Sequence, residues 1–127
     1  MSERDHVVLI VDDDADLLDA LTLILERRGY RVLSATSGEQ ALERMQAGPL
    51  PSLILFDLMM PGMSGWGLRQ KLLDDPTYAD IPVLVLSGDH AVLRNAPPPR
   101  CTNALRKPVD LLTLLDAVKR GCDEHRR

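Results

Sequence analysis

The feature that most constrains this chain is a fivefold alternation between short apolar runs and longer amphipathic segments. The runs lie at residues 7–11, 31–35, 53–56, 82–86 and, more weakly, 103–106. Three of them are almost continuously apolar, which is typical of parallel strands covered on both faces. The alternation of strands and helices predicts an α/β fold in which helices cover both faces of a doubly wound parallel sheet.

Local signals place the ends of the helices between these strands. Asp14 is expected to cap the first helix, which Gly29 ends, and Ser37 with Gln40 forms a capping box for the second. The second helix is expected to stop at Gly48-Pro49, the third to run from Ser64 to Asp75-Pro76, and the last to follow Asp110 and end at Gly121. Pro97-Pro98-Pro99 precedes the fifth strand, so the fourth helix is expected to be shortened to a turn or two.

Composition limits the classes of protein that this chain can belong to. With 127 residues, 45% of them apolar, we expect a single domain over 1–127, with its core at about 6–121 and a charged tail at 122–127. A net charge of −4 argues against nucleic-acid binding. The apolar runs are too short to span a membrane and the polar start lacks a signal peptide, so we expect a cytoplasmic protein. Cys101 and Cys122 are expected to be reduced thiols, and the three histidines, including His6, surface residues.

Polar residues follow four of the five predicted strands directly. Asp12, Asp13 and Asp14 follow the first strand, Asp57 the third, Ser87 the fourth, and Lys107 with Pro108 the fifth. Ligands of open α/β sheets bind beyond the carboxyl ends of the strands, so we expect these side chains to converge at one edge.

Such a cluster suits phosphoryl-transfer chemistry. Neighbouring carboxylates repel each other, and a hard divalent cation such as Mg²⁺ removes that repulsion. A carboxylate can also attack phosphorus to form an aspartyl phosphate, while the cation, a lysine and a hydroxyl neutralise charge on the transferred group. Each motif alone has an ordinary explanation as a helix cap, a turn or a solvated lysine. Together, four independent loops would have to place these residue types at one edge by chance.

In these residues the chain resembles the receiver domain of two-component response regulators along essentially its whole length. The matching motifs are Val11-Asp12-Asp13-Asp14, the segment from Asp57 to Gly65 (Asp-Leu-Met-Met-Pro-Gly-Met-Ser-Gly), Ser87, and Lys107-Pro108. The resemblance implies a flavodoxin-like (βα)5 fold with a five-stranded sheet of order 2-1-3-4-5.

The resemblance also implies the role of each carboxylate. Asp57 would be the phosphoacceptor, and Asp13 and Asp57 would ligate Mg²⁺ (or Mn²⁺) directly, together with the backbone carbonyl of Met59. Asp12 would contact the metal through coordinated water. Ser87 would donate a hydrogen bond to the phosphoryl group, and Lys107 would pair with its oxygens.

By the same resemblance, the phosphoryl group would come from a histidine kinase or a phosphotransfer protein, and its arrival would switch binding to an unknown downstream protein. The chain would catalyse only its own phosphorylation and dephosphorylation. Two alternatives stay open: a phosphate relay or sink, and a pseudo-receiver that is never phosphorylated and acts as a binding module. A phosphatase of the haloacid-dehalogenase type would need a second aspartate where this chain has Met59, and no GxGxxG motif follows the first strand.

The chain departs from the family in the region of the fifth strand. Many receivers carry an aromatic residue three positions before the lysine, where this chain has Ala104. The three prolines fall on the same face, which many receivers use to dimerise. We therefore expect the chain to be a monomer. From its net charge and its short apolar runs, we also expect it to bind neither nucleic acid nor membrane.

Overall fold

Five parallel strands form one sheet in the order β2-β1-β3-β4-β5. The computed structural model describes residues 6–57, 71, 74–79, 81–87, 101–106 and 111–125. The strands are β1 (Val7–Val11), β2 (Arg31–Ala35), β3 (Leu53–Asp57), β4 (Val83–Ser87) and β5 (Cys101–Arg106). The predicted α/β class and the strand order implied by the family resemblance are both confirmed.

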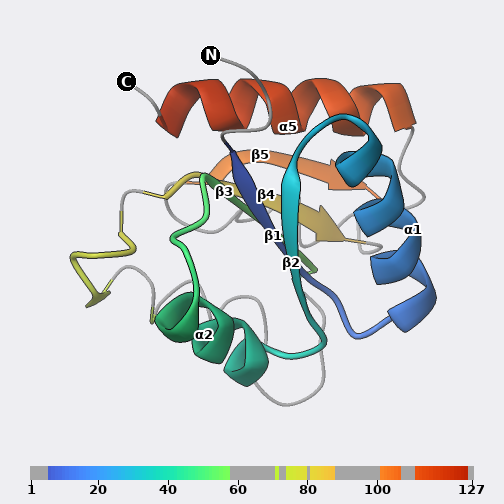
Figure 1. Cartoon of the computed structure of the whole chain (residues 1–127). Coiled ribbons are helices and arrows are strands. Elements are labelled where there is room, and N and C mark those ends of the chain that lie inside the picture. The colour runs from blue at the N-terminus through green and yellow to red at the C-terminus, as the bar shows by residue number, and fades with distance from the viewer. Residues whose placement is uncertain are drawn as a thin grey trace.

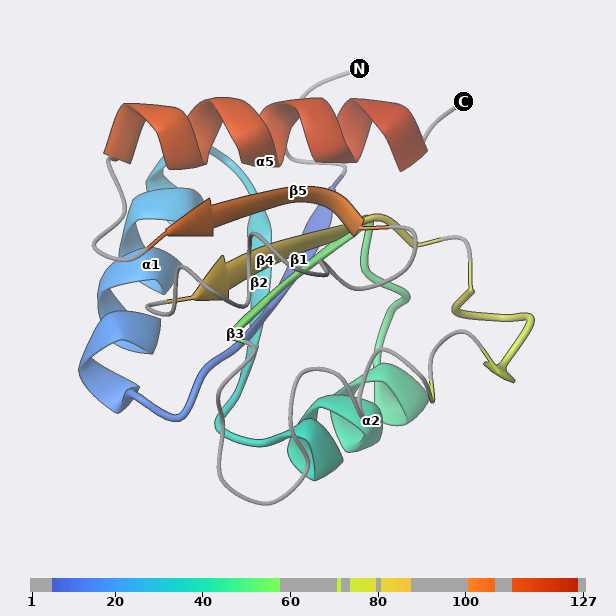
Figure 2. The same ribbon diagram turned by 180° about the vertical axis from the view of Figure 1, so that it is seen from behind.

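Helices cover both faces of the sheet. Helices α1 (Ala15–Arg27) and α5 (Leu111–His125) lie on one face, and α2 (Gly38–Ala47) lies on the other (Figure 1). The reverse view shows the same three layers, with the sheet between α5 and α2 (Figure 2). The predicted shortening of the fourth helix lies outside the described residues. Of the predicted third helix, Lys71 and Asp74 to Pro76 are described. Lys71 and Asp74 are helical, whereas Asp75 and Pro76 lie in a bend and a turn.

Strand residues alternate between two cores, as the pleat of a strand requires. The core under α1 and α5 contains Val8 and Ile10 of β1, Leu53 and Leu55 of β3, and side chains from both helices, among them Leu21, Leu25, Leu114 and Val118. The intervening strand residues, such as Leu9 and Ile54, are also fully buried. Burial on both faces explains why these strands are apolar throughout rather than at every second position.

The caps of α1 form as the sequence predicts. The Asp14 carboxylate accepts hydrogen bonds from the backbone N–H groups of Asp16 and Leu17, at 3.1 and 3.2 Å. At the other end Gly29 has a φ of 96°, a left-handed conformation that a side chain would strain. These two residues set where the helix begins and ends.

The capping box of α2 forms with one change of partner. Ser37 Oγ accepts from the backbone N–H of Gln40 at 3.1 Å, as expected. The Gln40 side chain, however, returns to the backbone N–H of Thr36 at 2.7 Å rather than to that of Ser37. Both side chains still accept from backbone N–H groups at the start of the helix that have no carbonyl partner within it. Gly48 ends the helix as predicted.

The predicted end of the last helix at Gly121 was wrong. Helix α5 continues to His125, and Cys122 is buried in the core as a free thiol. Gly121 is itself buried, and a Cβ added to it would lie 2.8 Å from Cδ1 of Leu53. Glycine stands here because the helix crosses a strand residue at close range, not because the helix ends.

The prediction that His6 lies at the surface was also wrong. Its side chain is only 6% exposed, and its ring centroid lies 6.5 Å from that of Tyr30. The backbone carbonyl of His6 accepts from the N–H of Arg31, which extends the pairing of β1 and β2 by one residue. Among the described residues, no helix is long and apolar enough to cross a membrane.

Candidate functional site at the carboxyl edge of the sheet

Backbone register brings the predicted site residues to one edge of the sheet. Val11 pairs with Phe56, so Asp12 and Asp57 each follow the same rung of the ladder between β1 and β3. Asp57 in turn pairs with Leu86, and Ser87 follows directly on β4. Because all three strands are parallel, Asp12, Asp57 and Ser87 lie at the carboxyl edge, where open sheets bind ligands.

Register extends this edge to the last strand. Ser87 pairs with Arg106, the final residue of β5. Lys107 is the next residue in the sequence and lies outside the described residues, as does Met59. For Asp57 and Ser87 the structure describes the backbone position, and their side chains are outside what it describes.

Asp12 is a buried carboxylate at the start of this edge. Only 1% of its surface is exposed, and its Oδ1 accepts a hydrogen bond from the backbone N–H of Asp14 at 2.9 Å. Its own N–H donates to the carbonyl of Ala35 at 3.1 Å, which holds it against the end of β2. A carboxylate in such a place is held at a defined position rather than solvated.

The three consecutive aspartates therefore differ in their surroundings. Asp12 is buried, Asp13 is exposed, and Asp14 is exposed but uses its carboxylate to cap α1. The role of Asp14 as the cap of α1 was predicted from the sequence and is confirmed. The burial of Asp12 beside the exposed Asp13 is what the structure adds.

The chemistry of this donor set fits a hard divalent cation. Mg²⁺ is usually held by one or two carboxylates together with water and phosphate oxygens. Asp12 and Asp13 supply two carboxylates at one strand end, and the backbone of Asp57 is on the adjacent strand. Among the side chains that the structure describes, no three acidic, histidine or cysteine residues form a metal-binding group, and the Asp57 side chain is not one of them.

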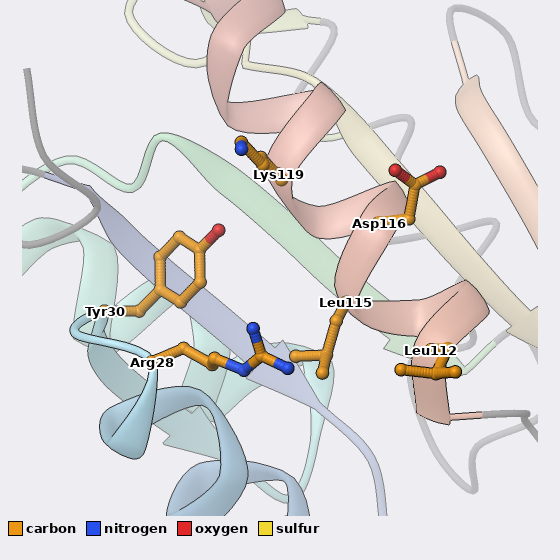
Figure 3. Close-up of a pocket in the computed structure, with 6 residues that line it drawn as sticks. All are labelled: Arg28, Tyr30, Leu112, Leu115, Asp116 and Lys119. Carbon is orange, nitrogen blue, oxygen red and sulfur yellow. The ribbon is translucent and has the colours of Figure 1, made fainter.

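A second feature, which sequence reasoning missed, is a pocket on the face covered by α1 and α5 (Figure 3). It has a volume of about 220 Å³ and lies between the turn that follows α1 and the outer side of α5. Its lining residues are Arg28, Tyr30, Leu112, Leu115, Asp116 and Lys119. The lining residues come from two segments far apart in the sequence. The arginine-rich run Arg27-Arg28-Gly29-Tyr30-Arg31 is a sequence signal that could have indicated the site.

Comparison with known proteins agrees with the fold. The family description of the response regulator receiver domain matches residues 8–119. The chain belongs to the response regulator receiver domain family. Receiver domains of two-component response regulators are signalling modules rather than enzymes in the usual sense.

Individual relatives support the same assignment. The response regulator receiver protein CpdR of Brucella abortus is 34% identical over 116 residues, which cover 89% of this chain and 93% of CpdR. A receiver domain protein from Clostridium thermocellum shares the fold with a TM-score of 0.84 at 25% identity, covering 95% of this chain and 97% of that one. TrrA from Thermotoga maritima, solved in complex with Mg²⁺ and BeF, has a TM-score of 0.80 with 91% and 98% coverage, and at 23% identity it bears on the fold alone.

The relatives also differ from this chain in length. The chain spans 32%, 28% and 18% of three other curated relatives, which are 34–42% identical to it over the matched part.

Proposed function

We propose that this chain is a phosphorylated receiver in which Asp57 accepts a phosphoryl group and thereby switches protein–protein interactions. The observation that carries the proposal is the register of β1, β3 and β4, which brings Asp12, Asp57 and Ser87 to one sheet edge. Asp57 is the central one of the three, because β3 lies between β1 and β4. We propose further that residues 1–127 act as one domain.

In the proposed reaction, a carboxylate oxygen of Asp57 attacks the phosphorus of a phosphohistidine. The new P–O bond forms as the P–N bond breaks, and the imidazole leaves with its electron pair. The product is an acyl phosphate on Asp57. Ser87 donates a hydrogen bond to the phosphoryl oxygens, and the Lys107 ammonium neutralises part of their charge.

Receiver domains use Mg²⁺ for phosphorylation, and we propose Asp13, Asp57 and the backbone carbonyl of Met59 as its direct ligands here. Asp12, buried and held by the N–H of Asp14, would contact the metal through water. When bound, the metal would supply positive charge beside the phosphoryl oxygens and relieve repulsion between the carboxylates. Mn²⁺ has similar ligand preferences and would substitute.

Receiver domains of response regulators interact with histidine kinases and phosphotransfer proteins, and we propose one of these as the donor. The downstream partner would be a protein that distinguishes the phosphorylated from the unphosphorylated edge. A relay role would show itself as return of the phosphoryl group from Asp57 to a histidine of a phosphotransfer protein.

The first prediction tests the acceptor. The purified chain, incubated with acetyl phosphate and Mg²⁺, should gain one phosphoryl group by intact mass, and Asp57→Asn should gain none because the amide is a poor nucleophile. Asp19→Asn, on the exposed side of α1, is the matched control and should be labelled like the wild type. Undiminished labelling of Asp57→Asn would disprove the assignment of the acceptor. A wild type that no phosphodonor labels would instead identify a pseudo-receiver.

A further inference from the structure

The pocket between α1 and α5 combines an apolar floor with a cationic rim. Tyr30, which is 5% exposed, and the half-buried Leu115 form the floor, and Leu112 stands beside them with 71% of its surface exposed. Arg28 extends its guanidinium toward Leu115, and the Tyr30 ring faces α5 (Figure 3). An exposed leucine next to a concave apolar surface is a feature of binding sites rather than of ordinary solvated helices.

The charge around this pocket is opposite to that of the chain. The turn from Arg27 to Arg31 contains three arginines and no acid, whereas the whole chain has a net charge of −4. On α5, Lys119 lines the pocket, and Asp116, its one acidic lining residue, forms an ion pair with Arg120 one turn on. Arg27, Arg28, Arg31, Lys119 and Arg120 are all exposed. The local field therefore favours a negatively charged partner.

The size of the pocket indicates what kind of partner fits. Sites for drug-sized ligands and cofactors usually enclose roughly 300–1,000 Å³. The volume here is about 220 Å³, which is sufficient for one large side chain but small for a nucleotide. Protein interfaces are commonly anchored by one aromatic or aliphatic side chain in a pocket, with charged residues around it.

We propose that this pocket is a docking site for an acidic protein segment that inserts one large apolar side chain between the α1–β2 turn and α5. Acidic residues on both sides of the anchor would pair with Arg28 and Lys119. The site is formed by the α1–β2 turn and the outer side of α5, whereas the phosphoacceptor edge is formed by strand ends. The proposal does not depend on phosphorylation, and binding should persist in Asp57→Asn.

The test is an NMR titration of the full chain with a synthetic peptide in which four glutamates flank one tryptophan. Amide shifts should cluster at the pocket-lining residues, with a Kd of about 1 mM or tighter. Replacing the peptide's tryptophan with alanine, or its glutamates with lysines, should abolish the shifts. The proposal would be overturned by shifts scattered over the surface or by equal binding of all three peptides. It would also be overturned if no shift appeared at peptide concentrations several times the expected Kd.

Variants of the chain separate the effect of charge at the pocket from the effect of overall charge. Arg28→Gln combined with Lys119→Glu should weaken binding by about tenfold, since two exposed charge pairs are lost or reversed. Arg44→Glu on α2, which covers the opposite face of the sheet, is the control and should bind like the wild type (Figure 1). If Arg44→Glu weakens binding as much, the effect is one of overall charge and the proposal fails.

Two other occupants are outcomes of the same titration. If the pocket amides shift with protein concentration alone, the occupant is a second copy of the chain. If inorganic phosphate shifts them as strongly as the peptide, the site is an anion site without an anchor. Either result would overturn the proposal of an acidic protein segment.

Discussion

Asp12, Asp13 and Asp14 are chemically identical side chains, and their surroundings give them different roles. Asp14 accepts two backbone N–H bonds and caps α1, Asp12 is buried and accepts from the N–H of Asp14, and Asp13 is exposed. A carboxylate that already satisfies helix donors has less capacity for a cation than one that faces solvent. The division predicts separable effects of substitution at neighbouring positions.

Substitution at Asp13 should act on the metal. We expect Asp13→Ala to weaken Mg²⁺ binding by at least about tenfold, the loss typical when even an outer partner of a metal is removed. In the absence of metal the same change should leave stability equal or higher, because a repelling charge is gone. Mg²⁺ titration followed by NMR, with thermal unfolding in chelator, measures both. Asp19→Ala on α1 is the control, and equal affinity in Asp13→Ala and wild type would count against the metal site.

Substitution at Asp14 should act on the helix. We expect Asp14→Ala to lower the free energy of unfolding by about 1 kcal/mol, because two N–H groups of α1 lose their acceptor. Asp14→Asn keeps an acceptor oxygen and should recover most of that loss. Urea unfolding without metal checks the pair. If asparagine proves as costly as alanine, the carboxylate acts through its charge and not through the cap.

At the scale of whole elements, α5 shows how packing overrides a local signal. A glycine followed by charged residues ordinarily ends a helix, yet α5 passes through Gly121 to His125. The packing leaves no room for a side chain at this position, because the fully buried Leu53 of β3 occupies the space. Close approach of helix and strand then buries Cys122 on the next position.

This contact predicts the effect of adding a methyl group to the helix. Gly121→Ala gains about 1 kcal/mol of helix propensity but overpacks the core, which typically costs about 1–3 kcal/mol. We expect a net loss of about 1 kcal/mol in urea unfolding. In a Leu53→Val background the cost should shrink, since the clashing methyl group has more room. A Gly121→Ala variant more stable than wild type would show that Leu53 adjusts at no cost.

At the scale of the molecule, the question is whether activation changes the oligomeric state. β5 is an edge strand, and the backbone of Ala104 pairs with Val85 in its middle. If Ser87 is drawn toward a phosphoryl group on Asp57, as we propose, alanine has no ring to reorient in response. One two-state element common in receivers is therefore absent from this sequence. The prolines at 97–99 remove backbone donors from the same part of the chain.

We therefore expect the chain to stay monomeric when beryllofluoride, a mimic of the phosphoryl group, is added with Mg²⁺. Light scattering during size exclusion, with and without the mimic, measures this directly. Binding of the mimic is verified in parallel by amide shifts near Asp57. A shift to dimer on activation, abolished by a charged substitution on the exposed side of α5, would contradict this prediction. It would show that the surface formed by β5 and α5 dimerises although position 104 lacks an aromatic residue.

Much of the fold could be predicted because its signals are local. The bounds of β1 and β2, the cap at Asp14 and the left-handed Gly29 follow from residues that contact their own neighbours in sequence. The convergence of strand ends was predictable as well, because parallel strands of one sheet share an edge. These features depend on backbone geometry and periodicity, which a sequence displays directly.

Tertiary contacts decided the remainder. The continuation of α5, the burial of His6 beside Tyr30, and the pocket between the α1–β2 turn and α5 each join residues far apart in the chain. The same is true within the Asp12–Asp14 run, where the end of β2 holds Asp12 through Ala35 and helps to distinguish it from its neighbours. The sequence by itself determined the order of elements and the residue types at the sheet edge. Only packing determined which of those side chains are buried, because burial depends on what distant segments bring beside them.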